Sequence, residues 1–176
     1  HKVLGGHMRL LVTGGSKFDP AVGRDLYGLG FTILQAYGLT ETSGAATINQ
    51  PHEAHIDTVG RVLPGNELTI LAPEGEAEDG EIAIRGPIVM QGYFNRPDAT
   101  AEVMRDGWFL TGDLGRLDDQ GRLTITGRKK EMIVLASGKN IYPEEIEAHY
   151  RKSTLSQKKQ RWPQPPLHAL AVARQL

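Results

Sequence analysis

A short polar stretch that follows a predicted strand carries most of the residues able to do chemistry. Residues 37–44, with the sequence YGLTETSG, offer an aromatic ring, several hydroxyl groups and a carboxylate. Tyr37 can lie flat against a base, Thr40 can donate to a phosphate, and Glu41 can reach a hard cation such as Mg²⁺, which prefers oxygen ligands. We therefore predict a ligand site here, the alternative being a strand followed by an ordinary polar loop.

The segment before this stretch predicts the carboxyl edge of an α/β sheet. Residues 9–13 and 31–36 are rich in β-branched and aromatic side chains and predict two buried strands. Between them, Asp19 can cap a helix that begins at Pro20. A strand–helix–strand unit favours parallel strands, whose carboxyl ends usually hold the ligand. We expect the second strand to break at Gly38.

Two glycines follow the first predicted strand. Gly14 and Gly15, ahead of Ser16, would let a ligand approach the backbone closely because they carry no side chain. A plain tight turn is the alternative reading of this short motif. Taken alone, GGS is a weak indication of a binding site.

The part of the sequence that follows residue 60 predicts antiparallel β-structure. Alternating apolar and polar residues, separated by turns, are typical of strands with one solvated face. The predicted strands cover residues 67–71, 81–86, 108–117 and 122–126, with a short helix from residue 97 to 103. The alternation stops at residue 127, after which a further strand over residues 131–135 and a helix from Pro143 are predicted.

Composition excludes several classes of protein. The chain has 176 residues, of which 39% are hydrophobic and 23% charged, as in an ordinary globular protein. It contains no cysteine, which excludes disulfides and thiolate chemistry, and no apolar run near the ~20 residues of a membrane span. His52 and His55 stand in a polar loop without the spacing of a zinc site, and no P-loop motif is present.

Three blocks in order carry a resemblance to a known family. Residues 37–44, 107–133 (GWFLTGDLGRLDDQGRLTITGRKKEMI) and 137–147 (SGKNIYPEEIE) together resemble the adenylate-forming acyl-CoA synthetases. The form of the last two blocks is most similar to long-chain fatty acid–CoA ligases. The resemblance covers roughly residues 9 to 152 and suggests an internal fragment of a longer enzyme.

The resemblance implies an α/β fold with a definite domain order. The expected parts are the end of a layered α/β nucleotide-binding subdomain (residues 1–60), a small antiparallel β subdomain (61–126), an interdomain hinge (127–130), the start of a small α+β C-terminal domain (131–152) and a non-family tail (153–176).

For the first block, the resemblance implies a nucleotide site. Tyr37 would pack on adenine. The walls of the same pocket would be formed by Gly14, Gly15, Ser16 and Gly38. Thr40 would bind a phosphate, and Glu41 would hold Mg²⁺.

For the two later blocks, the resemblance implies further residues of the nucleotide site, the interdomain hinge and a loop of the pantetheine tunnel. Asp113 would accept from both ribose hydroxyls, and Arg128 would contact the ribose or phosphate side of the adenylate. Lys130 falls where the family places its interdomain hinge, and Gly138 lies in a loop similar to the one that lines the pantetheine tunnel. Taken alone, Asp113 could instead shape a turn, and residues 128–130 could form a solvated basic turn.

The implied activity is that of an AMP-forming long-chain fatty acid–CoA ligase, which uses ATP, Mg²⁺ and coenzyme A. Adenylation for an acyl carrier protein and an inactive nucleotide-binding remnant stay open as alternatives. A cytoplasmic location is expected, and peripheral membrane association of the full-length enzyme is left open. Since the family's phosphate loop belongs before residue 1 and its catalytic lysine beyond the recognisable C-terminal part, we expect the isolated fragment to be inactive.

The tail differs in charge from the rest of the chain. Residues 1–150 carry 14 Lys and Arg against 21 Asp and Glu, whereas residues 151–176 carry six basic residues and no acidic one. Three prolines fall within residues 163–166, and no periodicity would bury a face. We expect residues from about Ser153 onward to be disordered and to result from a change of reading frame, so that no nucleic-acid partner is implied.

Overall fold

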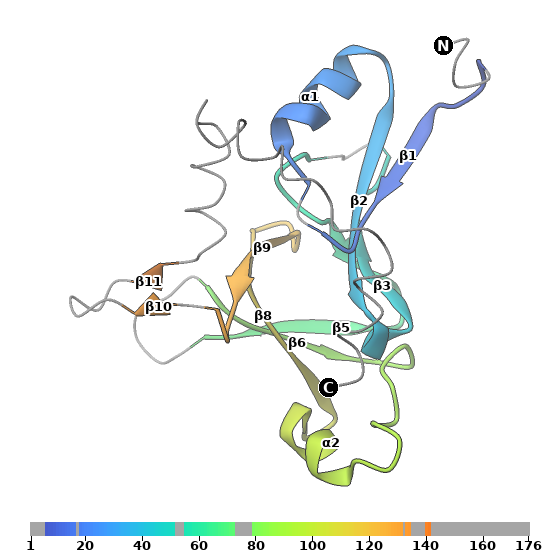
Figure 1. Cartoon of the computed structure of the whole chain (residues 1–176). Helices are drawn as coiled ribbons and strands as arrows, with labels where there is room; N and C mark the ends of the chain where they lie inside the picture. Colours follow the sequence, from blue (N-terminus) through green and yellow to red (C-terminus); the bar gives the residue numbers. More distant parts are fainter. Residues whose placement is uncertain are drawn as a thin grey trace, which may run out of the picture. The chain divides into compact units, whose positions relative to one another are not determined.

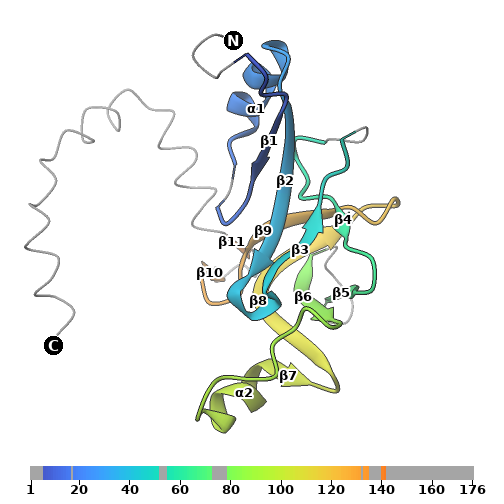
Figure 2. The same cartoon turned by 90° about the vertical axis from the view of Figure 1, so that its right-hand side faces the viewer.

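The computed structural model describes residues 6–16, 18–51, 55–72 and 79–131, together with the backbone of two short strands at residues 133–134 and 140–141. The chain divides into two compact units, His1–Glu131 and Met132–Leu176. The predictions for Gly138, for the helix from Pro143 and for the tail lie outside the described residues. In the first unit, two sheets meet around one core (Figures 1 and 2).

The first sheet confirms the predicted strand–helix–strand unit, but the prediction that its first strand is buried is wrong. The strand order of this sheet is β1 (Leu10–Thr13), β2 (Thr32–Leu39), β3 (Gly44–Ile48) and β4 (Arg61–Val62). Leu10 and Val12 are exposed because β1 is the edge strand, which among the described strands pairs with β2 alone. Strands β1 and β2 are parallel, and helix α1 (Pro20–Gly28) connects them. The carboxylate of Asp19 caps this helix by accepting a hydrogen bond of 2.8 Å from the backbone N–H of Ala21.

The prediction that the second strand breaks at Gly38 is wrong. Strand β2 continues to Leu39 because β3 pairs with it in antiparallel fashion, with a shift of register between Tyr37 and Gly38. A side chain at Gly38 would overlap the backbone of Gly44 on β3, so the glycine permits close pairing of the strands instead of ending one. The single-turn 3₁₀ helix η2 (Thr40–Thr42) follows β2.

The second sheet is antiparallel, as predicted. It contains β5 (Glu67–Leu71), β6 (Gly80–Arg85), β8 (Trp108–Leu117) and β7 (Met104–Arg105) in that order, and β9 (Leu123–Arg128) pairs with β8. The short helix α2 (Pro97–Val103) precedes β7, in agreement with the sequence. Strand β9 runs two residues beyond the predicted end because the ladder with β8 continues to the pair Asp113–Arg128.

A shared core joins the two sheets. Its buried members come from the first sheet (Tyr37 and Ala46) and from the second (Ile82, Ile84 and Leu123). Backbone hydrogen bonds of 2.8 Å run from the N–H of Val59 to the carbonyl of Leu123, and from the N–H of Leu123 to the carbonyl of Gly60. The segment that leads into β4 is thereby fixed against β9.

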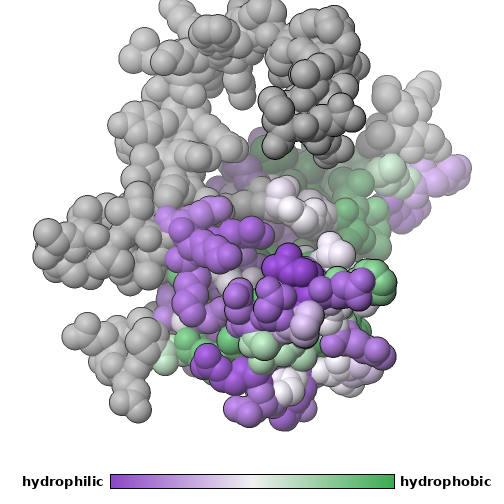
Figure 3. Space-filling model, turned by 60° about the horizontal axis from the view of Figure 1, so that its bottom comes forward, coloured by the Kyte–Doolittle hydropathy of each residue, from purple (hydrophilic) through white to green (hydrophobic). Residues whose placement is uncertain are grey.

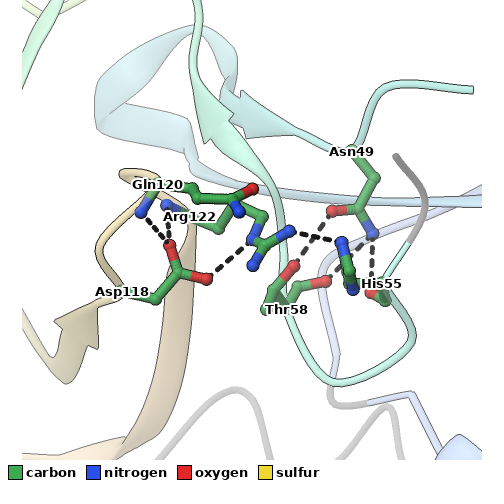
Figure 4. A network of polar contacts seen from close by, with 6 residues as sticks. All are labelled: Asn49, His55, Thr58, Asp118, Gln120 and Arg122. Atoms are coloured by element: carbon green, nitrogen blue, oxygen red, sulfur yellow. Dashed lines mark hydrogen bonds and ion pairs between the residues drawn. The ribbon is translucent and has the colours of Figure 1, made fainter. Parts of the chain in front are cut away.

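A polar network holds the loop before β4 against the turn between β8 and β9 (Figure 4). The amide of Asn49 donates to the carbonyls of His55 and Thr58, at 3.1 and 3.0 Å. The ring of His55 contacts the guanidinium of Arg122, which pairs with Asp118 at 2.6 Å. His55 thus takes part in a structural contact, and within the described residues no group of three His, Cys, Asp or Glu side chains could hold a metal.

The second unit contributes one described feature, the antiparallel pair of β10 (Ile133–Val134) and β11 (Asn140–Ile141). Strand β10 falls within the strand predicted over residues 131–135. In the part of the chain that the structure describes, no helix is long and apolar enough to cross a membrane.

The conformation of Gly60 leads to a stability prediction. Gly60 has a φ of +81°, and a side chain there would overlap the carbonyl group of Ile48. We expect Gly60→Ala to destabilise the chain by about 2–5 kcal/mol, the sum of left-handed strain and overpacking. Urea unfolding of the full chain measures the loss.

Gly121→Ala is the matched control, because Gly121 has a φ of +72° but open space around it. This variant should lose only the backbone component, about 1–2 kcal/mol. Equal losses in the two variants would contradict the close approach of Gly60 to β3.

Candidate functional site

An open pocket of about 490 Å³ lies beside the carboxyl ends of β1 and β2. It is lined by Gly14, Gly15, Ala36, Tyr37, Gly38, Leu39, Thr40, Gly44 and Ala45. The structure therefore brings together five of the residues that the sequence predicted for one site. Ser16, which follows the glycines, is exposed and does not line the pocket.

The glycine at the end of β1 is required by the pairing with β2. A Cβ atom at Gly14 would lie 2.8 Å from the carbonyl oxygen of Ala36, closer than real contacts allow. Gly15 has a φ of +80°, which turns the chain away from β1. The pocket wall at this point is consequently bare backbone, which a planar ligand can approach closely.

Tyr37 connects the pocket to the second sheet. Its ring is only 7% exposed, and its hydroxyl donates a hydrogen bond of 2.8 Å to Oδ2 of Asp113 on β8. Burial raises the pKa of the Tyr37 phenol above its ordinary value, and the negative charge of Asp113 raises it further. The phenol is therefore a permanent donor to the carboxylate at physiological pH.

Asp113 is a buried carboxylate with two protein partners. It is 5% exposed and lies within β8, which excludes the alternative that it shapes a turn. Its Oδ1 lies 3.0 Å from Nε of Arg128, the residue opposite it on β9. The structure thus brings Tyr37, Asp113 and Arg128 into one cluster, of which Tyr37 lines the pocket and Asp113 and Arg128 do not. The Arg128 side chain is 58% exposed and has room to move.

Glu41 and Thr40 stand where β2 gives way to the 3₁₀ turn. Thr40 is exposed at the pocket, and Glu41 is half-buried. The carboxylate of Glu41 accepts a hydrogen bond of 2.8 Å from the hydroxyl of Tyr93. Sequence reasoning did not single out Tyr93, because nothing local relates it to a residue 52 positions away.

Sequence reasoning also missed the role of Glu81 on β6. Its carboxylate accepts from the N–H of Gly112 at 3.2 Å and from the ammonium of Lys129 at 2.8 Å. These contacts fix β8 and the residue that follows β9 next to the Asp113–Arg128 pair, at the position where Lys129 lies opposite Gly112. Strand pairing across 31 and 48 positions creates them, and no sequence motif signals it.

Lys130 lies in the exposed turn of residues 129–131 that follows β9. The division between the two compact units falls directly after it, between Glu131 and Met132. The three basic residues at and after the end of β9 therefore differ in their surroundings. Arg128 and Lys129 pair with carboxylates, whereas Lys130 is exposed to solvent.

The raised pKa of Tyr37 predicts how stability depends on pH. In the unfolded chain the phenol ionises at its ordinary pKa of about 10, whereas in the folded chain it stays protonated. Stability is thus retained below about pH 10 and falls as the pH rises further. Tyr37→Phe should reduce this slope by up to about 1.4 kcal/mol per pH unit.

At neutral pH the same variant should lose about 1.5–3 kcal/mol, because the buried Asp113 carboxylate loses a donor. Urea unfolding between about pH 8 and 11 measures both effects. Some alkaline slope should remain, since the hydrogen bond to Glu41 raises the pKa of Tyr93 as well. Identical pH profiles for the variant and the unaltered chain would contradict a buried Tyr37–Asp113 bond.

Comparison with known proteins places this geometry in a family. The long-chain-fatty-acid–CoA ligase FadD15 of Mycobacterium bovis is 47% identical over 152 residues, which are 86% of this chain and 24% of the relative. The indoleacetate–CoA ligase of Aromatoleum aromaticum is 40% identical over 80% of this chain and 28% of its own length. The chain thus spans about a quarter of the length of the curated relatives it matches.

A solved structure shares the fold. The O-succinylbenzoate coenzyme A synthetase (MenE) of Bacillus subtilis, in complex with ATP and magnesium ion, aligns with a TM-score of 0.73 and 31% identity. The alignment covers 86% of this chain and 34% of that one. Both the mixed first sheet and the curled antiparallel second sheet therefore match part of an adenylate-forming enzyme.

The family model for AMP-binding enzymes matches residues 1–94, more than half of the chain. These residues include the pocket, Glu41 and Tyr93. The chain belongs to the family of AMP-binding enzymes.

Proposed function

We propose that this chain is the adenylate-binding part of an ATP-dependent, AMP-forming fatty acyl-CoA synthetase. The observation that carries the proposal is the pocket at the end of β1 and β2, which lies beside a buried carboxylate held by Tyr37 and Arg128. A nucleoside phosphate requires this combination: a flat wall for the base, an acceptor for the ribose and donors for the phosphate. The names of several similar proteins support a fatty acid as the substrate.

The nucleotide would use groups that the cluster leaves free. Oδ2 of Asp113 accepts the hydrogen bond from Tyr37 and Oδ1 pairs with Arg128, and each oxygen can accept a further hydrogen bond. Two ribose hydroxyls would therefore bind Asp113 without displacing Tyr37. The adenine would lie against the bare backbone of Gly14 and Gly15 and the ring of Tyr37, with Gly38 beside it.

The residues present fit a magnesium ion that is bound mainly through the nucleotide. Glu41 is a single half-buried carboxylate beside Thr40, and no described cluster of three acidic or imidazole side chains could form a protein cage. Mg²⁺ typically takes one or two carboxylates together with substrate phosphates and water. When bound, the ion would neutralise charge on the phosphate oxygens during attack of the fatty acid carboxylate on the α-phosphorus.

The roles of the chain's own residues follow from these positions. Asp113 would orient the ribose, Thr40 would donate to a phosphate oxygen, and Arg128 would stabilise charge near the α-phosphate. The attack releases pyrophosphate and leaves an acyl-adenylate. Catalysis here consists of orientation and electrostatics, because no nucleophilic side chain is needed.

A second half-reaction would follow a rotation at the boundary of the two units. We infer that Lys130, in the solvated turn just before that boundary, is the hinge. Coenzyme A would attack the acyl carbonyl and displace AMP. An acyl carrier protein presents the same phosphopantetheine thiol, but the similar ligases are named for coenzyme A, which favours the free cofactor.

Substrate choice is tested by pyrophosphate exchange with fatty acids of several chain lengths, and with an aryl acid such as indoleacetate, in the protein as it is naturally expressed. Preference for long-chain acids supports the proposal. Exchange driven only by the aryl acid contradicts the fatty acyl assignment and leaves adenylation intact. The absence of exchange with every acid favours a nucleotide-binding remnant.

Asp113 provides the sharpest test of the nucleotide site. Asp113→Ala removes the ribose acceptor and should weaken AMP binding by about 1.5–3 kcal/mol, roughly ten- to hundredfold. Calorimetric titration of the full chain with AMP measures this loss. Asp79→Ala, which breaks the exposed ion pair with Arg116 elsewhere in the same sheet, is the matched control. Unchanged AMP affinity in a folded Asp113→Ala variant would refute the assignment.

The hinge proposal makes a separate prediction. Lys130→Pro fixes φ at the turn and should impair thioester formation at least about tenfold more than adenylation, because only the second step needs the rotation. The two half-reactions are measured in the full-length enzyme by pyrophosphate exchange and by acyl-CoA formation. Lys130→Ala, which leaves the backbone free, should keep their ratio. An equal loss of both reactions in the proline variant would speak against a hinge.

A further inference from the structure

The carboxylate of Glu41 is held by a tyrosine from a distant part of the chain. The hydroxyl of Tyr93 donates a hydrogen bond of 2.8 Å to Oε1 of Glu41. A second bond of 2.8 Å runs from the N–H of Met90 to the backbone carbonyl of Glu41. The segment of residues 90–93 is thus attached to Glu41 through both its backbone and its side chain.

Tyr93 itself is fixed by a tight turn before α2. Its backbone N–H donates to Oγ1 of Thr100 at 2.9 Å, and this hydroxyl donates to the carbonyl of Arg96 at 2.9 Å. A side chain at Gly92 would lie 2.9 Å from Cγ2 of Thr100, so the turn closes only around a glycine. The phenol therefore approaches Glu41 from a preorganised segment.

The hydrogen bond matters because a glutamate side chain is otherwise mobile. Holding its three torsions in one geometry costs conformational entropy, which a preformed donor offsets in advance. The bond occupies Oε1 only. Within the part of the chain that the structure describes, Oε2 accepts no hydrogen bond and is left for another ligand.

We propose that Tyr93 is a positioning residue that presents the Glu41 carboxylate to the divalent cation bound with ATP. This inference rests on the proposed function, in which Glu41 holds that cation. Tyr93 touches neither the nucleotide nor the metal in this scheme. It acts through Glu41, so its contribution should disappear when Glu41 cannot bind a cation.

A packing role alone does not account for the contact. The Tyr93 ring is 37% exposed and borders an open pocket of about 460 Å³, so little apolar surface depends on it. The face of the molecule that includes α2 is largely hydrophilic, with small separate hydrophobic groups (Figure 3). The hydroxyl of Tyr93 is the part of the side chain with a defined partner.

The test measures how ATP binding to the full chain depends on Mg²⁺. Calorimetric titrations with ATP are carried out in EDTA and at a series of Mg²⁺ concentrations. They give the Mg²⁺ concentration at which the gain in ATP affinity is half of its maximum. Tyr93→Phe should raise this concentration about three- to tenfold, the value of one ordinary solvent-exposed hydrogen bond. ATP affinity in EDTA and the unfolding temperature should not change.

A double-mutant cycle separates positioning from a general structural effect. Glu41→Gln should abolish the Mg²⁺ dependence, and adding Tyr93→Phe to it should change nothing further. Thr100→Val should reproduce part of the Tyr93→Phe effect by loosening the turn. Tyr27→Phe, which removes the hydroxyl bond to the carbonyl of Ile33, is the matched control and should leave the Mg²⁺ dependence as it was.

The outcomes are distinct. An unchanged or tightened Mg²⁺ dependence in Tyr93→Phe overturns the inference while the nucleotide site stands. An effect of Tyr93→Phe that persists in the Glu41→Gln background also overturns it, because the hydroxyl then acts elsewhere. Loss of ATP binding from the unaltered chain in both EDTA and Mg²⁺ overturns the proposed function and this inference with it.

Discussion

The buried hydrogen bond between Tyr37 and Asp113 is the interaction on which the rest of the site depends. It joins the first sheet to the second across 76 residues of sequence. Because a buried carboxylate without donors is strongly unfavourable, the two sheets must meet in the register that satisfies it. The same register sets Asp113 opposite Arg128 and in contact with Tyr37, which lines the pocket at the end of β1 and β2.

Close backbone approach is the second constraint. Gly14 lets β1 approach β2, Gly38 lets β3 cross the bulge in β2, and Gly60 lets the chain pass β3 on its way to β4. Each of these glycines removes a side chain from a place where the backbone or a ligand must fit. The pocket is therefore shaped by main chain, which changes little in conformation, while the charged groups around it come from side chains held by partners.

How much of the fold and of the site could be predicted depends on how far apart in the sequence the interacting residues lie. The helix at Pro20, the parallel pair of β1 and β2 and the hairpin of β8 and β9 follow from local caps, turns and alternation. The continuation of β2 to Leu39 could not be predicted, because it depends on pairing with β3. Two side-chain contacts were missed for the same reason: Tyr93, which donates to Glu41, and Glu81, which accepts from Gly112 on β8 and from Lys129 after β9.

The central claim is that a nucleotide binds the pocket beside Asp113. Titration of the isotopically labelled full chain with AMP, followed by two-dimensional NMR, tests it directly. The claim predicts that the largest shifts fall on the amides of Gly14, Gly15 and Gly38 and on those around Asp113. Shifts confined to the other pocket, around Gly92 and Ala101, or no shifts at saturating AMP, would contradict it.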